Sequence, residues 1–513
     1  MHAPRVVVIG AGIGGLAAAL ELAASGADVT VLERASGPGG KMRTVDVGGA
    51  GIDAGPTVFT MRWVFEALFE SVGLDFADVV HLDAAQTLAR HAWCDGSRLD
   101  LHADLQQTVD AISIFAGADE GRHYREFTQR ARKIYTTLEK PFIRSARTGP
   151  LGLMRNAGVR GFGDLLRISP FTTLWPALGK HFRDPRLQQL FARYATYCGS
   201  SPFLAPATLM LVAHVEQDGV WYVKGGMHQL ALAVQRAAER FGATFRFDAE
   251  VAEIHAERGR VEGITLQGGE RIGADAVVVN ADSAALTSGA FGAAAARAVP
   301  ASRATTRSLS AITWLMQART SGFPLQRHNV FFSTDYAREF SDIFGRAQVP
   351  SEPTVYVCAQ DRDDNDMPHT GTPERLLCLV NAPANGDTHA YTTREIRSCE
   401  ERSFGLLARC GLDVVPEPEA TRVVTPTDFN RLFPATGGAL YGPASHGWMA
   451  SFNRAGSTSR LRGLYLAGGS THPGPGVPMA TLSGRLAAAR LLKDFASIRS
   501  FHPMAMPGGT STR

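Results

Sequence analysis

The first forty residues carry the feature that most constrains the fold. A β-branched run, Arg5 to Ile9, leads directly into Gly10-Ala11-Gly12-Ile13-Gly14-Gly15, and an Ala/Leu-rich segment follows through about Leu22. In this context the glycines allow a tight turn, a close approach of the backbone to a pyrophosphate and close helix–strand packing. A second strand, Asp28 to Leu32, ends at Glu33, whose carboxylate can accept hydrogen bonds from ribose hydroxyls. The sequence therefore predicts a βαβ unit that binds a dinucleotide at a helix N-terminus.

Length and composition set outer limits on the architecture. A chain of 513 residues exceeds what one hydrophobic core usually supports, so we expect two domains that share an interface. The net charge of +3 gives no reason to expect a nucleic-acid partner. The six cysteines show no Cys-x-x-Cys spacing and no adjacent His cluster, so we expect neither a bound metal nor a disulfide framework.

Two further glycine-rich segments indicate that the bound dinucleotide contains a flavin and not a nicotinamide. The first is Gly37-Pro38-Gly39-Gly40-Lys41-Met42-Arg43-Thr44, continued by Asp53-Ala54-Gly55-Pro56-Thr57, and the second is Leu466-Ala467-Gly468-Gly469-Ser470-Thr471-His472-Pro473-Gly474-Pro475-Gly476-Val477-Pro478-Met479. They resemble the second and third cofactor motifs of the flavin amine oxidase and desaturase superfamily. The resemblance implies FAD, with a basic side chain near its diphosphate and ribityl region and the second segment wrapped around the flavin.

The helix that begins at Val477 has a physical use in this setting. Pro478 suits its first turn, where a backbone N–H is not needed. The positive end of the helix dipole stabilises the negative charge that forms on a reduced flavin. In the preceding loop we expect His472 to make a structural hydrogen bond, with a catalytic base as the alternative. Gly468-Gly469 departs from the Gly-Asp of many relatives, so no carboxylate contact to the flavin is expected from this loop.

The resemblance implies a set of FAD-binding residues and leaves the catalytic residues unknown. The set is Gly10, Gly12, Gly14, Gly15, Glu33, Arg34, Gly40, Lys41, Arg43, Gly55, Pro56, Thr57, Val251, Gly468, Gly469, Val477, Pro478 and Met479.

Blocks in the middle of the chain extend the resemblance to nearly its whole length. They include Tyr194 to Pro202, Ala205 to Thr208, Gly225 to Met227, His328 to Phe332 and Thr354 to Ala359. Together with the flavin motifs they resemble the bacterial phytoene and carotenoid desaturase family. The segments 55–65 and 474–480 are most similar to the 1-hydroxycarotenoid 3,4-desaturases, whereas phytoene desaturases usually have Asp-Pro where Met61-Arg62 stand here.

The resemblance implies an FAD-dependent oxidoreductase that desaturates an acyclic carotenoid. A hydride passes from C4 to flavin N5 and a proton leaves C3, which gives a 3,4-double bond in 1-hydroxy or 1-methoxy carotenoids such as 1-hydroxyneurosporene. The proton beside the resulting polyene cation is acidic, so a weak base suffices. Trp221 and Tyr222 are candidates for aromatic faces that stabilise this cation, with a plain core role as the alternative. Because no second dinucleotide fingerprint occurs, we expect oxygen or a quinone as electron acceptor.

Three other functions stay open at this point. Within the family the alternative is a phytoene or neurosporene desaturase. Outside it, a flavin amine oxidase acting on a soluble amine shares the fold and the first two motifs. A non-enzymatic lipid-binding escort protein built on the same fold is the third possibility.

A basic and aromatic stretch between 140 and 186 suits the headgroup layer of a bilayer. Its basic residues are Lys140, Arg144, Arg147, Arg155, Arg160, Arg167, Lys180, Arg183 and Arg186. A solvated Arg face over a helical core is the alternative. The chain starts without the elements of a signal peptide and has no run of about 18 apolar residues. We therefore expect peripheral contact with the cytoplasmic side of the inner membrane, which also holds the carotenoid substrate.

The predicted fold class is α/β, with a discontinuous Rossmann-like FAD-binding domain, an inserted substrate domain and a helical membrane-facing segment. The FAD-binding domain comprises residues 1–75, 225–310 and 455–495. Residues 76–224 form the largely helical membrane and substrate segment, residues 311–454 the substrate domain and residues 496–513 a flexible tail. Further strands are expected at Val251 to Ile254, Val261 to Leu266, Ala276 to Asn280 and Gly463 to Ala467, and a helix at Val477 to Leu492.

Overall fold

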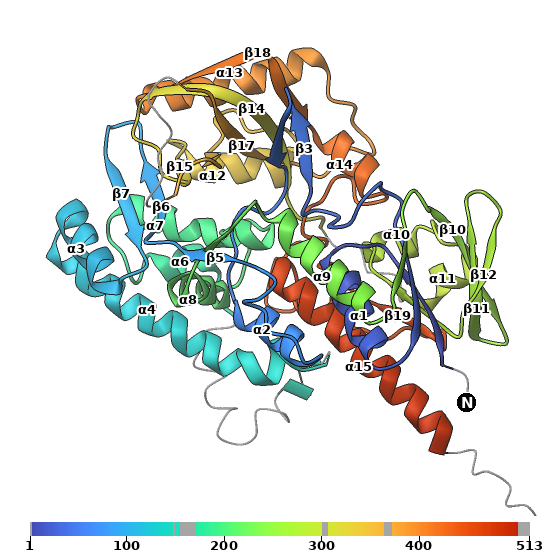
Figure 1. Ribbon diagram of the computed structural model, residues 1–513. Coiled ribbons are helices and arrows are strands. Elements are labelled where there is room, and N and C mark those ends of the chain that lie inside the picture. Colours follow the sequence, from blue (N-terminus) through green and yellow to red (C-terminus); the bar gives the residue numbers. More distant parts are fainter. Residues whose placement is uncertain are drawn as a thin grey trace, which may run out of the picture.

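A parallel five-stranded sheet joins both ends and the middle of the chain. The structure, a computed structural model, describes residues 3–146, 149–150, 152–153, 168, 171–299, 306–363 and 372–500 (Figure 1). The strands are, in spatial order, β19 (Leu464–Leu466), β13 (Ala276–Val279), β1 (Arg5–Ile9), β2 (Asp28–Leu32) and β9 (Thr244–Arg246). All four residues of β13 are buried, which is typical of a parallel strand covered on both faces.

Three helices cover one face of this sheet (Figure 1). They are α1 (Ile13–Ala24), α9 (His228–Arg240) and α15 (Val477–Ser500), and α1 lies between the other two. Glycine makes the contact between α1 and α15 possible. A Cβ added to Gly484 would lie 2.0 Å from the carbonyl oxygen of Gly14. The two helix backbones therefore meet where the dinucleotide fingerprint begins its helix.

A small antiparallel sheet covers the other face. Its strands are β10 (Val251–Glu257), β11 (Arg260–Leu266) and β12 (Arg271–Gly273). Ile254 and Ile264 pack there against Val7 and Val279 of the parallel sheet. The short helices α10 (Ser283–Thr287) and α11 (Ala293–Ala298) close this layer.

A second, mixed sheet of seven strands forms the other half of the molecule (Figure 1). In spatial order these are β18 (Leu412–Val424), β14 (Ser310–Gly322), β17 (Glu374–Ala382), β16 (Val355–Ala359), β15 (His328–Phe331), β6 (Thr87–Ala92) and β7 (Arg98–His102). Helix α13 (Thr393–Arg409) packs on it through Cys399, Leu406 and Leu407 and starts with a capping box at Thr392. Helices α12 (Tyr336–Phe340), η4 (Ser341–Gly345) and α14 (Pro426–Leu432) belong to the same half.

A helical layer with an aromatic core lies below the seven-stranded sheet (Figure 1). It contains α3 (Leu105–Ala116), α4 (Ala118–Leu138), η1 (Glu139–Ile143), α6 (Leu174–Leu178), α7 (Pro185–Ala192), η2 (Arg193–Cys198), η3 (Ala207–Met210) and α8 (Leu211–Asp218). Phe127, Phe182 and Phe191 are fully buried and in ring contact with one another. The connecting elements are β3 (Thr44–Val47), β4 (Ala50–Asp53), α2 (Trp63–Glu70), β5 (Leu82–Ala84) and β8 (Trp221–Val223).

The strands predicted in the parallel sheet are confirmed, and two other expectations need correction. The segment 76–224 is not only helical, because β6 and β7 join the seven-stranded sheet beside β15. Strand β6 forms a hairpin with β7, but its other partner, β15, lies far along the chain, where no local pattern can indicate it. Helix α15 continues to Ser500, so the tail predicted from residue 496 begins inside a helix. Tyr465 Oη donates to Asp494 Oδ2 over 2.8 Å and holds α15 just before this part. Residues 501–513 lie outside the described residues, and the domain boundaries stay a prediction.

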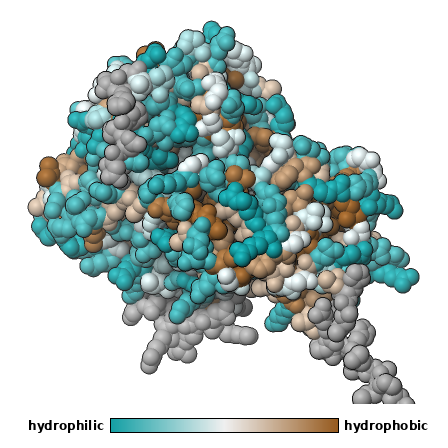
Figure 2. All heavy atoms as spheres, viewed as in Figure 1, coloured by the Kyte–Doolittle hydropathy of each residue, from teal (hydrophilic) through white to brown (hydrophobic). Residues whose placement is uncertain are grey.

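The predicted membrane-facing stretch is described only in part. Arg147, Arg155, Arg160 and Arg167 lie outside the described residues. Arg144 stacks 3.7 Å from the ring of Trp63 and pairs with Glu139, and Arg186 pairs with Asp184. On the face drawn in Figure 2, hydrophobic residues gather across the middle and most of the outer surface is hydrophilic. Among the described helices, none combines the length and the apolar character needed to cross a bilayer.

Candidate active site

A cavity of about 950 Å³ extends from the parallel sheet into the helical layer and the seven-stranded sheet. One end is lined by the three glycine-rich motifs. The other end is lined by α8, η1, η2 and the strands around Tyr356. A single space therefore connects the dinucleotide fingerprint with a largely apolar chamber.

The glycine turn shapes the first end of the cavity. Gly10 has a φ of +95°, a conformation that favours glycine. Gly12 and Gly14 line the cavity, whereas Gly15 lies behind them, and a Cβ there would be 2.1 Å from the Gly10 carbonyl oxygen. Gly15 therefore serves the close packing predicted for it and does not reach the cavity.

Glu33 lies at the carboxyl end of β2 with 7% of its surface exposed. Its Oε2 accepts from the N–H of Ala11 over 2.7 Å, and its Oε1 accepts from the N–H of Ala35 over 2.9 Å. A carboxylate has about four acceptor positions, so each oxygen keeps one for a hydroxyl donor in the cavity.

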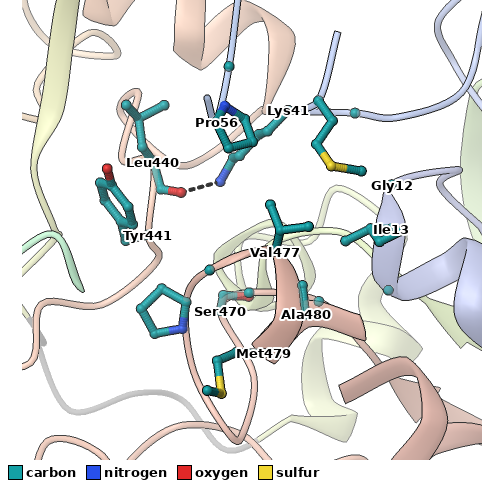
Figure 3. Close-up of a pocket in the computed structure, with 18 of the residues that line it drawn as sticks. Gly12, Ile13, Lys41, Pro56, Leu440, Tyr441, Ser470, Val477, Met479 and Ala480 are labelled. Carbon is teal, nitrogen blue, oxygen red and sulfur yellow. Dashed lines mark hydrogen bonds between the residues drawn. The ribbon is translucent and has the colours of Figure 1, made fainter. Parts of the chain in front are cut away.

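The second motif brings a lysine into the same space. Lys41 and Pro56 face Val477 at the start of α15, with Gly12 and Ile13 to one side (Figure 3). Lys41 Nζ donates to the carbonyl oxygen of Leu440 over 2.6 Å and lies 5.2 Å from the ring centre of Phe433. Burial lowers the pKa of Lys41, and the charge of Asp282 partly opposes that shift. The ammonium group of Lys41 therefore lies at a largely apolar part of the cavity wall.

The third motif is held by an arginine that sequence reasoning missed. Arg454 is 3% exposed and donates to the carbonyl oxygens of Pro443, Tyr441 and Gly469 at 2.7, 3.2 and 3.3 Å. Burial lowers its pKa to about 10, so it stays charged near neutral pH. Arg454 fixes the loop before α15 to the segment that carries Tyr441.

With the exception of Gly15, all of the predicted cofactor-binding residues line this one cavity. They are Gly10, Gly12, Gly14, Glu33, Arg34, Gly40, Lys41, Arg43, Gly55, Pro56, Thr57, Val251, Gly468, Gly469, Val477, Pro478 and Met479. Sequence reasoning missed Asn280, which also lines the cavity and whose amide donates to the Gly10 carbonyl oxygen over 3.3 Å. It follows the buried strand β13, and its position directly after that strand is the signal that could have found it.

Three other residues singled out in the sequence lie outside the cavity lining. His472 Nε2 lies 3.1 and 3.0 Å from the carbonyl oxygens of Phe142 and Ser145, so it ties the third motif to η1 as a structural group. Trp221 packs edge-on against Phe59, and Tyr222 packs against His328. Trp221 is partly buried and Tyr222 is buried, and their part in the reaction stays a prediction.

The sequence model of one family covers almost the whole chain. The family described as flavin containing amine oxidoreductase matches residues 13–492. The chain belongs to that family. FAD is accordingly its cofactor, and the protein is an FAD-dependent oxidoreductase.

Within this flavin-containing family, the similar curated proteins include carotenoid desaturases. A hydroxyneurosporene desaturase of Rubrivivax gelatinosus is 55% identical, covering 99% of this chain and 97% of that protein. The hydroxyneurosporene desaturase of Cereibacter sphaeroides is 43% identical, with 96% and 98% coverage. A 1-hydroxycarotenoid 3,4-desaturase of a Flavobacterium species is 30% identical, with 94% and 98% coverage. The predicted resemblance to the bacterial carotenoid desaturases is confirmed.

Solved structures support the same fold. Putrescine oxidase bound to putrescine is 16% identical, with a TM-score of 0.60 and coverage of 96% of this chain and 99% of that one. An oxidoreductase from Methanosarcina mazei is 15% identical, with a TM-score of 0.59 and 94% and 99% coverage. At these identities the likeness concerns the fold alone, and the predicted α/β flavoprotein architecture is confirmed.

The residues of this family member fit FAD at the motif end of the cavity. The backbone of Gly12 and Gly14 leaves room for a pyrophosphate at the N-terminus of α1. Glu33 keeps free acceptor positions for ribose hydroxyls, and α15 points its N-terminus at the cavity through Val477 and Met479 (Figure 3). The hydrogen-bonding groups and the two helix N-termini therefore suit the pyrophosphate, the ribose hydroxyls and the flavin ring of the cofactor.

The cavity wall outside the three motifs contains polar side chains that were not expected. Arg193, Tyr197, Glu216, Tyr336 and Tyr356 all line it. Two of them, Tyr197 and Tyr356, lie in blocks that carried the family resemblance. That resemblance marked the blocks but did not indicate that they meet.

Proposed function

We propose that this chain introduces a C3–C4 double bond into acyclic carotenoids that carry a hydroxyl or methoxyl group at C1. The observation that carries the proposal is the continuity between the motif end of the cavity and an apolar chamber. A carotenoid end group needs such a chamber, because its hydrocarbon surface must be removed from water. The similarity to hydroxyneurosporene desaturases over the full length supports the same substrate class.

The apolar chamber is built largely from the helical layer. Its aliphatic and aromatic lining includes Leu138, Phe142, Ile143, Leu209, Leu211, Val212, Val215 and Val330. These residues come from α4, η1, η3, α8 and β15, so the chamber depends on elements far apart in the sequence. Their role in the reaction is to hold the substrate in one orientation and to exclude water.

The residues at the motif end hold the cofactor in this proposal. The proposed set is the one predicted from the sequence, with Gly15 acting through packing, and Arg454 and Asn280 acting as supports of the turns. When bound, FAD supplies the acceptor for a hydride. The N-terminus of α15 and the buried Lys41 place positive potential at this end, which favours a site that takes up negative charge. Oxygen or a quinone is the proposed final electron acceptor.

Peripheral contact with a membrane is part of the proposal, because the substrate dissolves in lipid. An exposed patch supports it, which consists of the aromatic residues Phe171 and Trp448 together with Leu204 and is called the aromatic patch. Phe171 is 68% exposed and Trp448 45% exposed, and their rings lie 5.2 Å apart. Ser451, close to Trp448 in the chain, lines the cavity. Exposed aromatic side chains that lie together are typical of a surface that meets lipid.

Turnover in liposomes tests the proposal. The FAD-loaded protein is incubated with 1-hydroxyneurosporene, 1-methoxyneurosporene or phytoene in separate vesicles, with oxygen or a quinone supplied. Products are separated by chromatography and identified by absorption spectra. The proposal predicts that the hydroxylated or methoxylated substrate gives a product absorbing at longer wavelength.

Other outcomes separate the alternatives. Turnover of phytoene alone would indicate an early desaturase. Peroxide release with soluble amines and no lipid dependence would indicate an amine oxidase. A purified protein without a flavin spectrum would contradict the proposal as a whole.

A further inference from the structure

A buried polar cluster lines the cavity outside the three glycine-rich motifs and consists of Arg193, Tyr197, Glu216 and Tyr336. Tyr197 Oη donates to Glu216 Oε1 over 3.3 Å, and Arg193 donates to Tyr197 Oη and lies 4.8 Å from its ring centre. Tyr194, behind the cavity, donates to Glu216 Oε2 over 2.6 Å. The cluster therefore places a guanidinium group and a carboxyl group in a wall that is otherwise mostly apolar.

Burying such a cluster costs free energy. Arg193 is 9% exposed and Glu216 7%, and removing two charges from water costs free energy that their attraction often fails to recover. The phenolic oxygen of Tyr336 adds to this cost, because it is buried and has no hydrogen-bond partner among the residues that the structure describes. Most buried hydroxyl groups have a partner, so an unpaired one that lines a cavity indicates a polar atom of the ligand.

The Tyr336 hydroxyl is a hydrogen-bond donor in this position. Burial, followed by the charge of Glu339, raises the pKa of Tyr336 well above its ordinary value, with Arg193 opposing the shift. The phenol consequently keeps its proton at all physiological pH values. An uncharged alcohol or ether oxygen can accept a hydrogen bond from this hydroxyl group.

The polar cluster lies close to the flavin end of the cavity. Tyr356 Oη is 2.7 Å from Thr57 Oγ1, and Thr57 directly follows Pro56, which faces Val477 in Figure 3. Burial raises the pKa of Tyr356, and Tyr197 and Arg193 are near enough to influence that pKa as well. Tyr356 thus bridges the cofactor motif and the polar cluster.

The substrate class under the proposed function requires a polar group near the flavin. In a C1-oxygenated carotenoid, four bonds separate the oxygen from C4, and four bonds of about 1.5 Å span about 5 Å. A group that holds the oxygen must therefore lie within about 8 Å of the reacting carbon, once a hydrogen bond of about 3 Å is added. An oxygen so near the reacting carbons requires a polar group beside the flavin site and not at the distant end of a tunnel.

We propose that Tyr336, supported by Arg193, Tyr197 and Glu216, binds the C1 oxygen of the carotenoid and determines specificity for hydroxylated or methoxylated substrates. This inference rests on the proposed function and deepens it. Tyr336 donates a hydrogen bond to either kind of oxygen. Glu216 has acceptor positions left for the proton of an alcohol, which an ether lacks.

Binding to the FAD-loaded protein is the primary test, since it needs no turnover. 1-Hydroxyneurosporene and neurosporene are titrated in detergent micelles, and the perturbation of the flavin absorption spectrum gives each Kd. The wild-type protein should bind the hydroxylated carotenoid at least tenfold more tightly. Tyr336→Phe removes one hydroxyl and should abolish that preference, while the Kd of neurosporene stays within twofold. The matched control is Tyr124→Phe, at another buried tyrosine that does not line the cavity.

Two outcomes would overturn the inference. One is a wild-type protein that binds both carotenoids equally, and the other is a Tyr336→Phe variant that keeps the preference or loses affinity for both ligands alike. Turnover is measured separately on the same samples. Failure to desaturate any carotenoid, with the binding preference intact, would reject the proposed function and leave the oxygen site in place.

Discussion

The carboxylate of Glu33 accepts a hydrogen bond from the backbone N–H of Ala11 over 2.7 Å, which joins the end of β2 to the glycine turn after β1. The contact places an ionised acceptor beside the start of α1. It also fixes the carboxylate so that its remaining acceptor positions face the cavity. One side chain thereby orders the turn and prepares the position of a ribose.

Replacing this carboxylate with an amide should weaken FAD binding. In Glu33→Gln the NH₂ group faces one of the two backbone donors, so the variant loses a charge-assisted hydrogen bond. Such bonds contribute about 1.5 to 3 kcal/mol, which predicts a Kd for FAD at least about tenfold higher. Quenching of flavin fluorescence by the apoprotein measures it. Glu262→Gln, on the exposed side of β11, is the control, and equal Kd values for the two variants would contradict the prediction.

Two helix glycines should respond in opposite ways to alanine. A Cβ on Gly484 would lie 2.0 Å from the Gly14 carbonyl oxygen, so Gly484→Ala must separate α15 from α1 and should lower the free energy of unfolding by about 1 to 3 kcal/mol. Gly405 in α13 meets no atom closer than 3.9 Å, and Gly405→Ala should raise stability by about 0.5 to 1 kcal/mol. Thermal unfolding of both variants checks the signs. An unchanged Tm for Gly484→Ala would show that the helices can adjust freely.

The buried carboxyl group of Glu339 should make stability depend on pH. Glu339 is 1% exposed and accepts from Thr354 N–H over 3.1 Å and from the Asn381 amide over 3.0 Å. Burial raises its pKa to about 7 from an ordinary value of 4.5. The folded state therefore holds this proton more tightly than the unfolded state does, and stability falls as pH rises from about 4.5 to above 7. The expected loss is about 3 kcal/mol.

Urea unfolding of the FAD-saturated protein across this pH range measures the effect. Glu339→Gln cannot ionise, so the stability difference between the wild-type protein and this variant isolates the contribution of Glu339. As pH rises, the wild-type protein should become less stable relative to Glu339→Gln. A difference that does not change with pH would mean that the carboxyl group titrates normally.

The aromatic patch should contribute to membrane binding. Burying a large apolar side chain contributes about 1.5 to 3 kcal/mol, so the double variant Phe171→Ser and Trp448→Ser should bind liposomes at least about tenfold more weakly. Co-sedimentation with vesicles measures the partition coefficient. Ile114→Ser is the matched control, because Ile114 is 89% exposed on α3. If the control loses as much binding as the double variant, the patch has no special role.

The nucleotide-binding end could be predicted because its signals are local. The strand Arg5–Ile9, the glycine turn and the helix after it follow from neighbouring residues, and so does the position of Glu33 at the end of the next strand. The loop before Val477 could also be predicted from local residues, because its glycines and prolines determine the turns of the backbone. Family resemblance added the cofactor and the substrate class.

The tertiary structure decided which distant segments meet. Strands β6 and β7 join the sheet only because β15 offers an edge to them, and Gly484 matters only because α1 lies against it. The polar cluster joins Arg193, Glu216 and Tyr336 from three separate elements, and no pattern within any one element indicates a shared site. Local sequence determines turns, helices and strands through short-range sterics and hydrogen bonds. A site built across elements depends on the packing of the whole chain, which brings those side chains to one cavity.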